Sequence, residues 1–198
     1  MLYEEVEVKF LLDDLSAIRQ CLLALGATIH RPRIFEENLL FDTADHNLTQ
    51  QQRLLRLRRD QRNLITYKEP ASQTDPDFKI RTEYEIEVND FAQAQLILEK
   101  LGFFPTLRYE KYRETLTYQE AEIVLDETPC GNFMEIEAPR EVIRSLAAAL
   151  GLDFTTRIVA SYADIFAAVC RTYQLQATDM TFAAFRGLSI DLHACHVA

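Results

Sequence analysis

The stretch Glu5-Val6-Glu7-Val8-Lys9, near the start of the chain, decides the fold. Successive side chains of a β-strand point to opposite faces, so Glu5, Glu7 and Lys9 share one face. Val6 and Val8 share the other. In most half-buried strands the apolar face packs on a core and the charged face meets water. Because the same charged alternation returns in several later strands, the sequence predicts that the charged face is itself an interior.

Further strands are predicted wherever β-branched or aromatic residues alternate with other residues. These stretches are residues 36–43, 53–60, 62–69, 78–88, 106–118, 120–127 and 131–138. With the opening strand they make about eight strands, which present too many charged faces for an open sheet. We therefore predict an α+β protein in which an eight-stranded antiparallel β-barrel is surrounded by helices packed outside it.

Three segments share one design, in which a Glu-x-Glu strand is followed by an amphipathic helix and then by Leu-Gly. The predicted helices run from about Asp14 to Gly26, from Asp90 to Gly102 and from Pro139 to Gly151. Asp and Pro favour the start of a helix, and Gly favours the left-handed cap at its end. Internal duplication and the general likeness of strand–helix units account for this pattern equally well.

The predicted organisation is one domain over residues 1–175 and a C-terminal tail over residues 176–198. The domain ends in a further helix predicted over residues 157–173, where apolar residues recur at helical spacing. The tail carries three large apolar residues: Phe182, Phe185 and Leu188. These side chains could dock on the body or face a partner, and a homodimer is one outcome of the second case.

Composition excludes several classes of function. The chain has 198 residues and a net charge of −10, which argues against sequence-independent nucleic-acid binding, since such proteins carry a basic surface. An 18-residue apolar run and a signal peptide are absent, so no membrane partner is predicted. The four cysteines are scattered, which favours free thiols in the cytoplasm. The motif His193-Ala194-Cys195-His196 contains metal-capable side chains, but no metal site is predicted in this end of the chain.

The charged strand faces together hold a nearly balanced set of acids and bases. They are Glu5, Glu7, Lys9, Arg56, Arg58, Lys68, Arg81, Glu83, Glu85, Glu87, Lys111, Arg113, Asp126, Glu135 and Glu137. Solvated faces with cross-strand ion pairs account for any one strand taken alone. The repetition over many strands favours charges that converge inside the barrel, where water and a ligand must fill the space, because unpaired buried ions cost several kcal/mol each.

A tunnel that holds both bases and carboxylates suits a polyanion bridged by a divalent metal. Arg and Lys bind phosphate oxygens directly, and Arg does so through two parallel hydrogen bonds. Carboxylates hold Mg²⁺ or Mn²⁺, which prefer oxygen ligands and keep several waters. The charge pattern therefore predicts a phosphate-rich ligand and a Mg²⁺ or Mn²⁺ cofactor.

Seven motifs follow one another along the chain: Glu5-x-Glu7-x-Lys9, Leu55-Arg56-Leu57-Arg58, Tyr67-Lys68, Arg81-x-Glu83-x-Glu85, Lys111-Tyr112-Arg113, Leu125-Asp126-Glu127 and Phe133-Met134-Glu135-Ile136-Glu137. In this order, with residues 38–43 and 161–164, they resemble the CYTH superfamily, the triphosphate tunnel metalloenzymes, over roughly residues 3 to 170. The resemblance implies an eight-stranded antiparallel tunnel that acts on triphosphates with Mg²⁺ or Mn²⁺. Family members include class IV adenylate cyclases, thiamine triphosphatases and inorganic triphosphatases.

The same resemblance implies roles for the interior charges. Glu5, Glu7, Glu135 and Glu137 are the implied metal ligands, with Asp126 as a further ligand or as an anchor behind them. The implied triphosphate clamp consists of Lys9, Arg56, Arg58, Lys68, Arg81, Lys111 and Arg113. The implied catalytic set consists of Glu5, Glu7, Lys9, Glu83 and Glu85. Within that set, Glu83 and Glu85 either orient bases or help a second metal to activate water.

The favoured reaction is hydrolysis of the terminal phosphate of tripolyphosphate or of an organic triphosphate such as thiamine triphosphate. The first alternative is a class IV adenylate cyclase that converts ATP to cyclic AMP and pyrophosphate. The second is a module that binds polyphosphate or a nucleotide without turnover, and the third is a structural protein with salt-bridged strand faces. No motif in the sequence separates hydrolase from cyclase.

Two positions depart from the family pattern. Many members carry a basic residue just before the Ser-Tyr pair of the last helix, where this chain has Ala160. Arg157, one turn earlier, is expected to substitute for it by reaching the tunnel mouth. The glycine often found ahead of the Leu-Arg-Leu-Arg strand is replaced by Gln52-Arg53, for which only a local change of the turn is expected.

Overall fold

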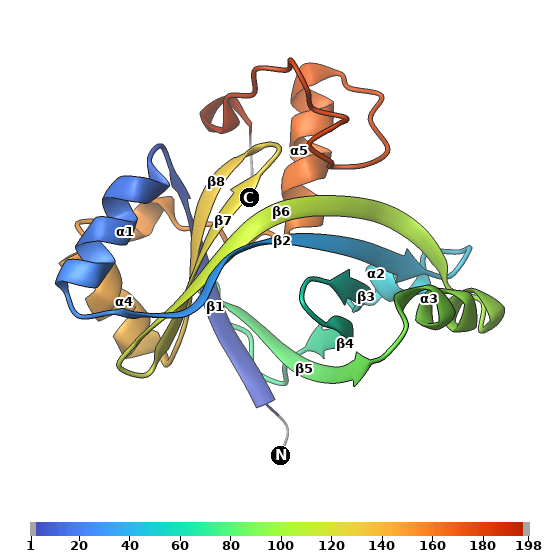
Figure 1. Ribbon diagram of the computed structural model, residues 1–198, viewed down its shortest axis with the longest axis horizontal. Coiled ribbons are helices and arrows are strands. Elements are labelled where there is room, and N and C mark those ends of the chain that lie inside the picture. The colour runs from blue at the N-terminus through green and yellow to red at the C-terminus, as the bar shows by residue number, and fades with distance from the viewer. Residues whose placement is uncertain (1–2, 196–198) are drawn as a thin grey trace.

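The computed structural model describes residues 3–195. Within them, eight antiparallel strands close into a barrel in the order β1-β5-β4-β3-β2-β6-β7-β8 (Figure 1). The strands are β1 (Tyr3–Leu12), β2 (Thr28–Asp42), β3 (Leu54–Arg59), β4 (Asn63–Pro70), β5 (Lys79–Val88), β6 (Phe104–Tyr118), β7 (Ala121–Thr128) and β8 (Gly131–Glu137). The α-helices are α1 (Leu15–Ala24), α2 (Asn47–Gln50), α3 (Phe91–Lys100), α4 (Arg140–Ala149) and α5 (Tyr162–Tyr173). The predicted α+β class and closed antiparallel barrel are confirmed.

Helices cover the apolar outer face of the barrel, as the alternation predicted. Helices α1 and α4 lie together on one side, and α3 lies on the opposite side (Figure 1). Under α1 and α4, Val8 and Ile136 of the barrel share a core with Leu22 and Ile143 of the helices. Each side chain of this size contributes about 1.5–3 kcal/mol when fully buried. The hydrophobic cores therefore lie outside the barrel wall, which leaves the interior to the charged residues.

The helix termini follow the predicted signals. Asp14 caps α1 by accepting hydrogen bonds from the backbone N–H groups of Ser16 and Ala17. Asp90 caps α3 in the same way by accepting a hydrogen bond from the backbone N–H of Gln93. Gly26 adopts a left-handed conformation with φ of 97° after the first of these helices, which a residue with a Cβ adopts only with strain.

Strand β2 starts at Thr28, eight residues before the predicted start at position 36, and this prediction was wrong. The strand is bent by register shifts against β6 between Ile29 and Arg31 and between Arg31 and Ile34. Pro32, which has no N–H to give to a ladder, lies inside this irregular stretch. The irregularity breaks the period of two from which a strand is recognised.

Helix α5 starts at Tyr162, so the helix predicted from residue 157 was five residues too long at its start. Ile158 instead pairs with β1, since it exchanges both backbone hydrogen bonds with Lys9 at 2.9 and 2.7 Å. Ser161 and Asp164 then form a capping box that opens the helix. Tertiary pairing with β1 therefore outweighs the helical spacing of the preceding residues.

The C-terminal tail packs on the body in this structure. Strand β7 pairs with β6 only from Tyr112 onward, and the tail occupies the edge of β6 that precedes this point. There the N–H of Met180 donates to the carbonyl of Arg108 at 2.9 Å, and the N–H of Glu110 donates to the carbonyl of Met180 at 3.0 Å. Phe185 is buried against Phe166 of α5 with ring centroids 6.2 Å apart, whereas Leu188 is exposed. The tail therefore covers this edge of β6.

Two further observations concern membrane-spanning helices and the His193–His196 motif. None of the helices found in residues 3–195 has the length and apolar character needed to span a bilayer. His196 of the His193–His196 motif lies outside the described residues, and the N–H of His193 donates to the Asp191 side chain.

Candidate active site

A polar cavity of about 300 Å³ occupies the barrel interior. Among the described residues, nine bases line it: Lys9, Arg31, Arg56, Arg58, Arg62, Lys68, Lys79, Lys111 and Arg113. Nine acids also line it: Glu5, Glu7, Glu36, Asp60, Glu83, Glu85, Glu122, Glu135 and Glu137. The volume lies at the lower end of the range for small-molecule sites. The prediction that the charged strand faces meet in one interior is confirmed.

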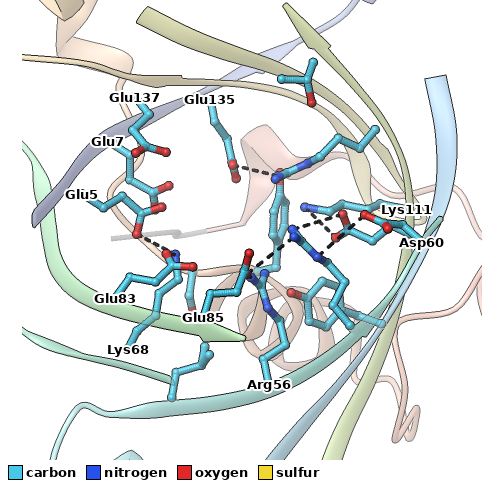
Figure 2. Close-up of a pocket in the computed structure, with 18 of the residues that line it drawn as sticks. Glu5, Glu7, Arg56, Asp60, Lys68, Glu83, Glu85, Lys111, Glu135 and Glu137 are labelled. Carbon is cyan, nitrogen blue, oxygen red and sulfur yellow. Dashed lines mark hydrogen bonds and ion pairs between the residues drawn. The ribbon is translucent and has the colours of Figure 1, made fainter. Parts of the chain in front are cut away.

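Strand register explains why residues distant in sequence converge. Glu7 of β1 lies between Lys79 of β5 and Glu137 of β8, and Lys9 lies beside Glu135. Across the barrel, Arg56 and Arg58 of β3 follow the same inward alternation. Figure 2 shows the two groups on opposite sides, with Glu5, Glu7, Glu135 and Glu137 on one wall and Arg56 and Lys111 on the other. The cavity is thus polarised, with an acidic wall facing a basic one.

Lysines hold the carboxylates of the acidic wall. Lys68 Nζ lies 2.6 Å from an oxygen of Glu5 and 2.6 Å from an oxygen of Glu83. Lys79 Nζ lies 2.6 Å from Glu7 Oε1. Within residues 3–195, no group of three or more His, Cys, Asp or Glu side chains stands in an arrangement ready to hold a metal ion. A divalent metal would therefore have to displace a lysine from the carboxylate it binds.

The negative charge of Glu5 is less well compensated by its surroundings than that of Glu7. Burial raises the pKa of Glu5 above its ordinary value of 4.5, and the nearby Glu7 carboxylate raises it further. At Glu7, burial alone would also raise the pKa, but Lys79 and Lys9 outweigh it and hold the pKa well below the ordinary value. Carboxylate oxygens suit a hard divalent ion such as Mg²⁺ or Mn²⁺. The donor atoms therefore match Mg²⁺ or Mn²⁺ in chemical type, while lysines hold Glu5 and Glu7 in this structure.

Replacing Glu5 with glutamine is expected to stabilise the metal-free protein at about pH 8. A carboxyl with a raised pKa in the folded state stabilises the fold when protonated, below about pH 4.5, and loses that contribution as the pH rises through the raised value. Thermal unfolding of Glu5→Gln in EDTA should give a higher Tm than wild type at about pH 8, with the difference closing on acidification. Glu7→Gln should show a lower Tm at the same pH, because the pKa of Glu7 is depressed. A Tm of Glu5→Gln below that of wild type at about pH 8 would contradict this.

Asp126 lies behind the cavity wall and is fully buried. It accepts hydrogen bonds from Arg113 Nε at 2.7 Å and Nη2 at 2.6 Å, and from Lys111 Nζ at 3.1 Å. The Tyr162 hydroxyl donates to the same carboxylate at 2.6 Å. Although burial alone would lower it, Asp126 and Glu135 hold the pKa of Arg113 well above its ordinary value. These contacts make Asp126 an anchor for the bases Arg113 and Lys111, whereas the predicted role was a metal ligand or an anchor behind the metal ligands.

The basic wall contains donors without partners. The Nε atoms of Arg56 and Arg58 are buried and find no hydrogen-bond acceptor among the described residues. The acceptors nearest Arg58 are loose, with Glu85 at 3.6 Å and Glu36 at 3.8 Å. Burial lowers the pKa of Arg58, and the neighbouring Arg56 lowers it further. Buried donors left unsatisfied cost about 1–3 kcal/mol each, and charged ones more, so this wall suits an anionic ligand.

Most residues predicted for the barrel interior or its mouth line the cavity, with four exceptions. Asp126 lies behind the wall, as described above. Arg81 shares the inward alternation of β5, yet its guanidinium donates to the carbonyl of Gln52 and is not among the described residues that line the cavity. Arg157, expected to reach the tunnel mouth, binds Asp77 instead, so this expectation was wrong. Glu87 is also exposed outside the cavity, 3.8 Å from Arg62.

Sequence reasoning missed several residues that line the cavity. They are Arg31, Glu36, Asp60, Arg62, Lys79, Tyr109 and Glu122. Lys79 continues the alternation of Arg81, Glu83 and Glu85 by one further step, so the pattern itself contained the signal. Arg31 gave no signal, because it belongs to the irregular stretch of β2.

Comparison with known proteins agrees with this architecture. A protein from Vibrio parahaemolyticus named as a candidate adenylate cyclase has 24% identity and a TM-score of 0.76, covering 85% of this chain and 100% of its own. The PH1819 protein of Pyrococcus horikoshii OT3 has 26% identity and a TM-score of 0.69, covering 83% and 98%. HpAC1 from Hippeastrum, a candidate adenylyl cyclase described as having a dominant triphosphatase activity, has 21% identity and a TM-score of 0.60, covering 82% and 95%. Among curated protein sequences, no match is found.

The sequence profile of the CYTH domain matches residues 4–153. This range begins in β1 and ends after α4, so it includes every strand of the charged barrel. The chain therefore belongs to the CYTH domain family.

Proposed function

We propose that the protein is a Mg²⁺- or Mn²⁺-dependent enzyme that hydrolyses the terminal phosphate of a triphosphate held inside the barrel. The observation that carries this proposal is the polarised cavity. Its basic wall holds two buried guanidinium Nε donors without a hydrogen-bond partner, and its acidic wall gathers Glu5, Glu7, Glu135 and Glu137. A triphosphate with a divalent metal satisfies both walls at once. The description of HpAC1 from Hippeastrum supports hydrolysis as the reaction.

In this proposal the chain's own residues bind and orient the substrate. Arg56, Arg58 and Lys111 take phosphate oxygens and neutralise the charge that develops during phosphoryl transfer. Glu83 orients Lys68, and Glu85 orients Arg56 and Arg58, which it approaches to 3.9 and 3.6 Å. The metal would be held by Glu5, Glu7, Glu135 and Glu137. Once bound, it would supply positive charge to the phosphate oxygens and acidify water.

A class IV adenylate cyclase is the second candidate, because part of the cavity is apolar. Leu40, Leu54, Tyr109 and Ala163 line it together with the charged residues. Such a lining could receive an adenine ring, or equally the organic group of another triphosphate. In a cyclase the ribose 3′-hydroxyl attacks the α-phosphorus and pyrophosphate leaves, so the two reactions give different products.

Product analysis tests the proposal. Tripolyphosphate, thiamine triphosphate and ATP are offered separately with Mg²⁺ and then with Mn²⁺, and excess EDTA serves as the control. Orthophosphate release that stops in EDTA is the expected result, and the ratio of kcat/KM values identifies the preferred substrate. Cyclic AMP with pyrophosphate from ATP would establish the cyclase instead. Tight binding of triphosphate without any product would contradict both enzymatic candidates.

A further inference from the structure

Tyr162, the first residue of α5, joins three charged groups of the barrel interior. It is 7% exposed and lines the cavity. Its hydroxyl donates to Asp126 Oδ2 at 2.6 Å. The ammonium nitrogens of Lys9 and Lys111 lie 5.2 and 4.7 Å from the centre of its ring. The edge-to-face contact with Phe133, at 5.5 Å and 80°, fixes the orientation of the ring.

The two lysines come from strands that are not neighbours. Lys9 lies on β1, which pairs with β5 and β8, and Lys111 lies on β6, which pairs with β2 and β7. Sheet hydrogen bonds therefore do not set the distance between their ammonium groups directly. Both side chains are almost completely buried, with Lys9 3.0 Å from Glu135 and Lys111 3.1 Å from Asp126. The ring of Tyr162 is a contact that both ammonium groups share, and its quadrupole attracts each of them.

The chain on both sides of α5 is bound to the strands that carry these lysines. Before the helix, Ile158 exchanges backbone hydrogen bonds with Lys9 itself. After the helix, Met180 binds β6 at Arg108 and Glu110, next to Lys111. Figure 1 shows α5 and the following tail, coloured orange to red, beside β6. The position of Tyr162 is thus tied to both strands at once.

We infer that Tyr162 is a positioning residue for the triphosphate site: its ring holds the ammonium groups of Lys9 and Lys111 in place, and its hydroxyl fixes the Asp126 carboxylate that anchors Lys111 and Arg113. This inference rests on the proposed function. The segment from Ile158 to Met180 is accordingly part of the site, because its pairing with β1 and β6 brings the ring of Tyr162 close to the two lysines.

Binding of tripolyphosphate in EDTA tests this role without any dependence on turnover. Tyr162→Leu removes both the ring and the hydroxyl, and it is expected to raise the Kd, measured by calorimetry, about tenfold or more, since two cation–π contacts are lost. Tyr162→Phe keeps the ring and removes only the hydroxyl, so it is expected to raise the Kd about threefold, less than Tyr162→Leu does, because Asp126 still retains Lys111 and Arg113. Tyr84→Phe on the exposed outer face of β5 is the matched control and should bind as wild type does.

The outcomes separate this inference from the proposed function. Tyr162→Leu with a lower Tm but an unchanged Kd would overturn the positioning role and leave the function standing. Wild-type protein that neither binds nor hydrolyses any triphosphate would overturn both. If Tyr162→Leu does not fold, NMR of ¹³C-labelled lysine in the wild type decides instead. Two ε-methylene signals should be shifted upfield by the ring and should move on addition of tripolyphosphate, and the absence of such signals would overturn the inference.

Discussion

Replacing Glu7 with glutamine is expected to reduce triphosphate turnover by at least about a thousandfold while the fold stays intact, because a charged group of the metal-binding wall is lost. Glu7 is buried between Lys79 and Lys9, at 2.6 and 3.5 Å, and stands next to Glu137 in the register of β1 and β8. Glutamine keeps the shape of the side chain but removes the negative charge. The remaining carboxylates then hold a divalent ion more weakly. The phosphate oxygens are left without the positive charge that this ion would supply.

Turnover with Mg²⁺ and Mn²⁺, circular dichroism and thermal unfolding together check this expectation. Glu137→Gln should lose turnover to a similar extent, since it removes a negative charge from the same wall. Glu4→Gln is the matched control, because Glu4 lies on the same strand but is exposed on the opposite face. Full activity of Glu7→Gln with either metal would remove Glu7 from the predicted metal-binding and catalytic sets.

Arg58→Met and Arg113→Met are both expected to weaken triphosphate binding at least about tenfold, yet only Arg113→Met is expected to lower the stability of the fold. Arg58 is buried, its Nε makes no hydrogen bond and lies 3.9 Å from Asp60, and Arg56 stands beside it. Its replacement should leave the Tm unchanged or raise it. Arg113 binds Asp126 through two hydrogen bonds and Glu135 at 2.8 Å. Its replacement leaves those carboxylates with fewer partners, which costs about 3–5 kcal/mol for a buried pair.

Calorimetric binding of tripolyphosphate and denaturant unfolding of both variants check this contrast. Arg19→Met is a suitable surface control, since Arg19 binds Glu114 outside the tunnel at 2.7 Å and an exposed ion pair contributes little to stability. A loss of stability in Arg58→Met comparable to that of Arg113→Met would contradict this prediction. It would show that Arg58 stabilises the ligand-free fold. The expected divergence would show instead that Arg58 is retained for its ligand at a cost to the empty fold.

Several features of the site follow from local pattern alone. The alternation in Glu5, Glu7 and Lys9 places the charges on one strand face, and the same argument holds for Arg56 and Arg58. Asp14 and Asp90 mark helix starts through capping that involves only neighbouring backbone groups. These inferences succeeded because a strand's period of two and a helix cap depend on residues within one element.

Other features could not be predicted in this way. The bend of β2 hides Arg31, and the backbone pairing of Ile158 with Lys9 shortens α5. Arg81 lies on the inward face of β5 by alternation, but its long side chain donates to the carbonyl of Gln52 instead. The alternation of a strand determines the face from which a side chain leaves the backbone. It does not determine where the guanidinium group of a long, flexible arginine lies.

The sequence by itself determined the strands, the charged face of each and the apolar face that meets the helices, because these depend on short-range periodicity. Only the tertiary structure decided which charge meets which. Lys68 bridges Glu5 and Glu83, Asp126 turns from a predicted ligand or anchor into a buried partner of Arg113, and Tyr162 comes to lie beneath Lys9 and Lys111. The physical reason is that ion pairs and ring contacts act over a few ångströms between residues far apart in sequence. Their partners are therefore set by strand register and by closure of the barrel.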